Sequence, residues 1–130
     1  MHIESPKKRV PKSEKEVFAF LADPANFEKL MPDTIEKFRL LDPDTFLFSL
    51  RGMPEIVLKK KEEHPHSQVV YGAASDKLPF TLSAQIRALS EQETEVTLNF
   101  EGAFNAMMAM MVKAPITNFL NTLSENLGKI

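Results

Sequence analysis

The chain has 130 residues, of which 43% are hydrophobic and 26% charged. This is the mix of one ordinary globular domain, and it excludes wholesale disorder. Sixteen basic and eighteen acidic residues give a net charge of −2, which argues against nucleic acid as a partner, because nucleic-acid-binding proteins normally carry a basic face. The absence of cysteine excludes disulfides and thiolate chemistry.

No stretch of the sequence has the character of a signal peptide. The longest run without a polar residue is 106–112, far shorter than the roughly 20 residues that cross a bilayer. We therefore expect a cytoplasmic protein without stable membrane insertion.

Two short helices are predicted near the N-terminus. Ser13 followed three residues later by Glu16 is typical of a capping box, and the apolar residues after it recur at helical spacing to about Ala22. Asp23 and Pro24 then begin a second helix, because aspartate suits the N-cap and proline the first helical position.

From residue 34 to residue 102 the apolar residues alternate with polar ones, which indicates strands covered on one face only. Short turn-forming segments separate the strands, so we expect an antiparallel meander, since parallel neighbours need long crossovers. Residues 3–10 can add one strand before the helices. The sequence thus predicts six or seven strands.

A long helix is predicted from Asn105 almost to the C-terminus. Apolar residues recur every three or four positions as far as Leu127, and Gly128 is a suitable stop. We expect this helix to cover the apolar face of the sheet, because it is the largest helical element.

This order of elements resembles the helix-grip fold of the SRPBCC superfamily, which includes START domains, birch-pollen-allergen-like proteins and polyketide cyclase/dehydrase-like proteins. The segments 13–18 and 21–32, SEKEVF and LADPANFEKLMP, are similar to the helix signature of that superfamily. The resemblance implies a single α+β domain over residues 1–130, with a curved antiparallel sheet and a long C-terminal helix. It also implies a cavity between sheet and helix that holds an apolar ligand.

If one face of each strand points inward, fourteen residues are expected to line that cavity. They are Phe27, Leu30, Phe38, Phe46, Phe48, Ile56, Leu58, Val69, Tyr71, Phe80, Leu82, Met107, Met111 and Phe119. We expect Phe27 and Leu30 to gate it. The alternative is that the same side chains fill the core and leave no cavity.

Few groups on the inward positions are suited to acid–base chemistry. Tyr71 is the only tyrosine, and Glu36 and Lys60 fall near strand ends; all three have simpler structural interpretations. His64 and His66 are an incomplete ligand set in a turn, so neither a metal nor a cofactor is expected.

Three functions are consistent with these patterns. The first is binding or transport of a small hydrophobic molecule, such as a lipid, polyketide-like or isoprenoid-like compound. The second is a polyketide cyclase/dehydratase-like enzyme. The third is a co-chaperone-like interaction module that docks through the methionine-rich segment 107–111, and a homodimer is one form that such docking could take.

Overall fold

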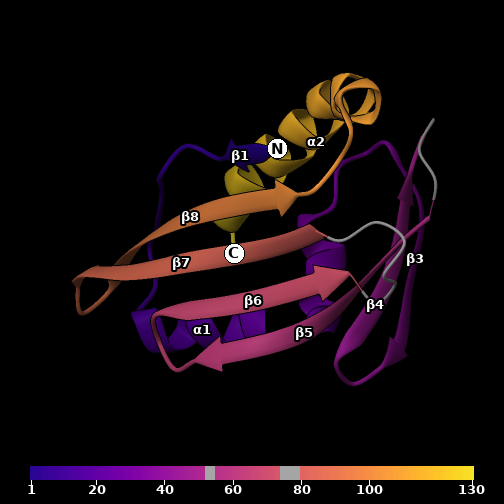
Figure 1. Ribbon diagram of the computed structural model, residues 1–130. Coiled ribbons are helices and arrows are strands. Elements are labelled where there is room, and N and C mark those ends of the chain that lie inside the picture. Colours follow the sequence, from indigo (N-terminus) through magenta and orange to yellow (C-terminus); the bar gives the residue numbers. More distant parts are fainter. Residues whose placement is uncertain (52–54, 74–79) are drawn as a thin grey trace.

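The computed structural model describes residues 1–51, 55–73 and 80–130. A curved antiparallel sheet has the long helix α2 lying across it, while the two shorter helices lie at its other end (Figure 1). The elements are β1 (His2–Glu4), β2 (Lys8–Val10), α1 (Glu14–Ala22), the 3-10 helix η1 (Pro24–Leu30), β3 (Ile35–Asp42), β4 (Thr45–Leu50), β5 (Ile56–His64), β6 (Gln68–Ala73), β7 (Phe80–Ser90), β8 (Glu93–Gly102) and α2 (Ala106–Leu127).

The strands are ordered β1-β8-β7-β6-β5-β4-β3, and β2 also pairs with β8. In the described part of the chain the sheet therefore has eight strands, and the expectation of a single strand over residues 3–10 is wrong. Pro6 has no N–H to donate, so the ladder is interrupted there. On either side of the interruption β1 and β2 both pair with β8, and between them the Ser5 N–H donates to the Leu98 carbonyl at 2.8 Å.

The helices begin as predicted. The Ser13 hydroxyl accepts from the Glu16 N–H at 3.2 Å, and the Glu16 carboxylate accepts in return from the Ser13 N–H. The Asp23 carboxylate caps η1 by accepting from the Ala25 N–H at 3.1 Å. Local capping chemistry thus sets both starts.

Aromatic rings fill the interior between the sheet and the short helices. The Phe27 ring of η1 stacks on Phe46 of β4 and meets Tyr71 of β6 edge to face, both with ring centroids 5.0 Å apart. Phe48 of β4 stacks on Phe119 of α2 at the same separation. One cluster therefore ties η1, β4, β6 and α2 together.

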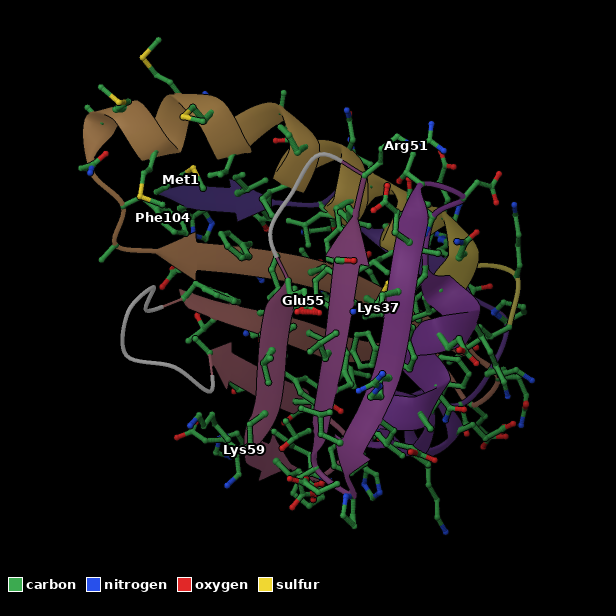
Figure 2. The ribbon with its side chains drawn as sticks, turned by 90° about the vertical axis from the view of Figure 1, so that its right-hand side faces the viewer. Met1, Lys37, Arg51, Glu55, Lys59 and Phe104 are labelled. Carbon is green, nitrogen blue, oxygen red and sulfur yellow. The ribbon has the colours of Figure 1, made fainter. Side chains whose placement is uncertain are left out.

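The two halves of α2 have different surroundings. Every buried residue of the helix lies between Ile116 and Leu127, and none lies before Pro115. Met107, Met110 and Met111 are 74%, 83% and 71% exposed, and sulfur-bearing side chains project from this half of the helix (Figure 2). No helix of the described residues is both long and apolar enough to cross a membrane.

Candidate ligand-binding site

A cavity of about 390 Å³ lies between the sheet and α2. Its walls come from the segment before β3, the end of β4 and the middle of α2, and they are Pro32, Thr34, Leu50, Arg51, Ala114, Pro115, Asn118, Phe119 and Thr122. The volume falls within the range of small-molecule sites, about 300–1,000 Å³. The sheet and the C-terminal helix are the two elements between which the family resemblance implies a cavity.

Each wall has a local structural cause. The Arg51 N–H donates to the Thr34 carbonyl at 3.0 Å, which joins the end of β4 to the start of β3. On α2 the lining residues Pro115, Asn118 and Phe119, followed by Thr122, have helical spacing and so share one face. The Phe119 ring is held by its stacking on Phe48.

The floor of the cavity is apolar and its mouth is polar. Leu50 and Phe119 are buried, whereas Thr34, Arg51 and Asn118 are exposed. Arg51 is the single charged side chain among the described residues that line the cavity. The cavity can therefore hold an apolar body on its floor with a polar group towards solvent.

Most of the residues predicted to line a cavity form the core instead. Nine of the fourteen are buried: Phe27, Leu30, Phe46, Phe48, Leu58, Val69, Tyr71, Leu82 and Phe119. Phe38, Ile56 and Phe80 are partly buried and pack against them. Of all fourteen, only Phe119 lines the cavity beside α2, because the other core side chains contact one another.

Phe27 and Leu30 do not lie where a gate would be. Both are buried; Phe27 stacks within the aromatic cluster, and the Leu30 carbonyl accepts from the Asn126 side-chain amide at 2.8 Å. The expected gate position is therefore wrong: η1 turns these side chains into the core, and Pro32 and Thr34 after it reach the cavity.

Met107 and Met111 do not face the sheet, and the prediction that they do is wrong. In the half of α2 before Pro115, the side chains that point inward are those of Met108 and Val112, and both are half-buried. This face continues the helical repeat of Ile116 and the buried residues after it. Met107 and Met111 each precede it by one residue, which is a rotation of about 100° around the helix.

Tyr71 and Lys60 cap the C-terminal end of α1. The Tyr71 hydroxyl donates to the Leu21 carbonyl at 2.8 Å, and the Lys60 ammonium donates to the Ala22 carbonyl at 3.0 Å. The Asn26 side-chain amide donates to the Phe20 carbonyl at 3.0 Å. Three successive carbonyls at the end of α1 thus accept from side chains, and that of Phe20 also accepts from the Asp23 N–H at 3.4 Å.

The electrostatics of these two groups agree with a capping role. Burial raises the pKa of Tyr71 far above its ordinary value, and the nearby carboxylates of Asp23, Glu63 and Asp44 raise it further. Burial lowers the pKa of Lys60, but Glu63 and Asp44 outweigh it, so the net pKa lies above the ordinary value. Tyr71 stays neutral and Lys60 stays charged at neutral pH.

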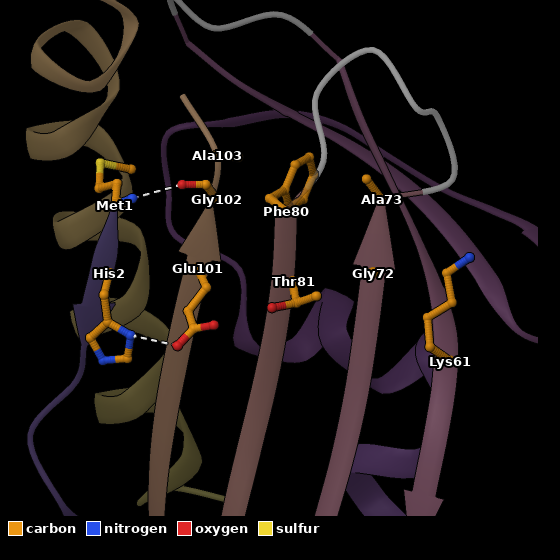
Figure 3. Close-up of a pocket in the computed structure, with 10 residues that line it drawn as sticks. All are labelled: Met1, His2, Lys61, Gly72, Ala73, Phe80, Thr81, Glu101, Gly102 and Ala103. Carbon is orange, nitrogen blue, oxygen red and sulfur yellow. Dashed lines mark hydrogen bonds and ion pairs between the residues drawn. The ribbon is translucent and has the colours of Figure 1, made fainter. Parts of the chain in front are cut away.

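A wider hollow of about 740 Å³ lies over the middle of β5, the ends of β6 and β8 and the start of β7, beside β1 (Figure 3). Its side chains include Lys61 and Thr81, and His2 lies 3.0 Å from the Glu101 carboxylate. The predicted residue Phe80 lines this hollow rather than the cavity beside α2. No three His, Asp or Glu side chains converge to hold a metal in the described ranges 1–51, 55–73 and 80–130.

The remaining titratable candidates lie away from both hollows. Glu36 is exposed on β3. His64 lies 3.7 Å from the Glu62 carboxylate, and the His66 ring meets Phe18 edge to face at 5.6 Å. None of the three is brought towards the cavity beside α2.

Solved structures share this fold. Norcoclaurine synthase from Thalictrum flavum superposes with a TM-score of 0.77 at 12% identity, over 99% of this chain and 91% of that one. A START superfamily protein from Mycobacterium smegmatis superposes with a TM-score of 0.71 at 12% identity, over 98% of this chain and 94% of that one. A conserved protein from Geobacillus kaustophilus superposes with a TM-score of 0.73 at 10% identity, over 99% of this chain and 93% of that one. No protein-family model and no curated protein sequence matches this chain.

The chain therefore has the helix-grip α+β fold, as its sequence predicted. At these identities the likeness establishes the fold and leaves the chemistry to the site.

Proposed function

We propose that the protein binds a small hydrophobic molecule, of lipid, polyketide-like or isoprenoid-like character, in the cavity between β4 and α2. The observation that carries the proposal is the cavity's apolar floor of Leu50 and Phe119 beneath a polar mouth. Each ~100 Å² of apolar ligand surface buried there contributes about 2.5 kcal/mol, before the costs of association.

Binding without chemistry accounts for the side chains better than catalysis does. A cyclase or dehydratase needs a titratable group against its substrate, but Tyr71 and Lys60 cap α1. Arg51, the ionisable group on the described cavity wall, keeps its proton in proteins. Every buried side-chain nitrogen or oxygen of the described residues already has a hydrogen-bond partner.

A second candidate function is protein interaction through the exposed methionines of α2. The run from Ala106 to Val112 is apolar on every side of the helix, and a helix of this character is usually buried. Size-exclusion chromatography with light scattering tests the self-association form of this function. A mass of twice 14.7 kDa would support it, and a strict monomer would contradict it.

Native mass spectrometry of gently purified protein, followed by organic extraction, tests ligand binding directly. We expect a discrete bound apolar species that extraction removes. The location is tested by Ala114→Phe, which places a ring at the cavity mouth, with Ala106→Phe as the matched control. Both alanines are exposed on α2, and only Ala114 lines the cavity.

We expect Ala114→Phe to weaken binding of the extracted compound at least tenfold and Ala106→Phe to leave it unchanged. Equal affinity in the two variants would contradict the cavity as the site. Thermal unfolding of both variants controls for any change in the stability of the helix itself.

A further inference from the structure

We propose that the ligand of this cavity is an amphipathic acid whose carboxylate or equivalent anion is bound by Arg51 at the mouth. The inference rests on the proposed function and adds the chemical class of the ligand. Its apolar body would lie on Leu50 and Phe119, and its anionic group would point to solvent.

The backbone places Arg51 at the cavity mouth. Arg51 follows β4 directly, and its N–H is held by the Thr34 carbonyl at 3.0 Å. Figure 2 shows Arg51 at the end of the sheet close to α2. The side chain therefore begins at a fixed point beside the apolar floor.

The charge of Arg51 lacks a protein counterion in the described residues. Two other basic residues of the sheet have carboxylate partners: Lys37 lies 3.1 Å from the Glu55 carboxylate, and Arg9 lies 3.4 Å from that of Glu93. No carboxylate of the described chain comes within 4.0 Å of Arg51, and no Asp or Glu is among the described lining residues. Asp33, which lies between the lining residues Pro32 and Thr34 along the chain, is exposed.

The chemistry of the mouth selects for an anion. A guanidinium presents five N–H donors in a planar fork that matches a carboxylate. Asn118 and Thr122, one helical turn apart on α2, add an amide and a hydroxyl beside it. An anion at this exposed position keeps part of its hydration, so the cost of burying its charge is small. A cationic ligand would meet repulsion from Arg51.

Matched acids and neutral amides test the inference. The probes are decanoate with decanamide, and 2-naphthoate with 2-naphthamide, titrated into ¹⁵N-labelled protein. The affinity is measured from the shifts of backbone amides and of the Asn118 side-chain amide, which reports on the site. The proteins are the unmodified chain, Arg51→Gln, Arg51→Lys and the control Arg39→Gln, an exposed arginine of β3 outside the cavity.

We expect each acid to bind about tenfold more tightly than its amide, with a preference that shrinks as salt is added. Arg51→Gln should remove the preference without changing amide binding, Arg51→Lys should retain part of it, and Arg39→Gln should retain it all.

The outcomes separate the two proposals. Equal binding of acid and amide at the cavity would overturn the anionic ligand and leave the proposed function standing. A preference for the acid that survives Arg51→Gln would overturn the role of Arg51. Failure of every probe to shift Asn118 at millimolar concentration would overturn the proposed function, and this inference with it.

Discussion

The two ends of the interior are built differently. At the closed end, where α1 and η1 pack beneath the sheet, stacked rings fill the space and side chains cap the last carbonyls of α1. At the open end, where β4 finishes beside the middle of α2, a cavity remains, and three methionines are exposed on the preceding half of the helix. The difference indicates that packing at the closed end stabilises the fold, whereas the open end keeps the cavity of the proposed site.

Pro115 lies at the boundary between the two halves of α2. It lines the cavity, and it has no N–H for the Met111 carbonyl one turn earlier. The buried residues from Ile116 onward fasten the second half to the sheet. The first half contributes only half-buried side chains such as Met108 and Val112 to the interior, so it depends more on its own helical hydrogen bonds.

The largest effect on stability is expected from truncation in the fastened half of α2. Leu120 is fully buried, so Leu120→Ala should lower the free energy of unfolding by about 2–5 kcal/mol through lost burial and a residual cavity. Met110→Ala in the free half should change it by less than about 0.5 kcal/mol. Urea unfolding followed by circular dichroism measures both. Similar losses of unfolding free energy in the two variants would show that the first half of α2 is also packed against the sheet.

A smaller effect is expected at the closed end from Tyr71→Phe. The variant removes the hydrogen bond to the Leu21 carbonyl and leaves a buried acceptor without a partner, which should cost about 1–3 kcal/mol. The same urea experiment measures the loss, and ligand affinity at the open end should not change. A loss of binding with unchanged stability would instead place Tyr71 in the ligand site.

The buried Tyr71 hydroxyl at the closed end predicts that the folded protein loses stability in alkali. Burial raises the pKa of Tyr71 in the folded protein, whereas the unfolded chain loses this proton near pH 10. The contribution of neutral Tyr71 to the free energy of unfolding is therefore complete below about pH 10. As the pH rises above that value, the free energy of unfolding falls by about 1.4 kcal/mol per pH unit. Lys60, whose folded pKa is also raised, acts in the same direction.

Absorbance at 295 nm can follow this transition, because the chain has one tyrosine and no tryptophan. We expect tyrosinate to form only as the protein unfolds. Tyr71→Phe should show a smaller loss of stability between pH 9 and pH 11. A native tyrosine that ionises near pH 10 would contradict the buried, capping hydroxyl.

The smallest effect is expected from replacing Met107 and Met110 together by glutamine. Exposed positions outside the core tolerate such changes to within about 0.5 kcal/mol, so the unfolding midpoint should stay the same. A loss above 1 kcal/mol would show that these side chains are packed, and a change in mass by light scattering would show that a second molecule covers this half of α2.

The sequence by itself determined the order and the ends of the elements, because these depend on neighbouring residues. Ser13 and Glu16 cap α1, Asp23 caps η1, and the alternation of apolar residues marks the strands. The interruption at Pro6 was missed, although a proline, which cannot donate to a ladder, marks it in the sequence.

Only the tertiary structure decided which apolar residues close the core and which border a cavity. Burial of a side chain depends on neighbours that are distant along the chain, so alternation could not separate Phe48 in the core from Leu50 on the cavity floor. The rotation of the first half of α2, which exposes Met107 and Met111, follows from how Ile116 and later residues seat on the sheet. Arg51 carried no periodic signal, because its place at the mouth arises from the meeting of β4 with α2.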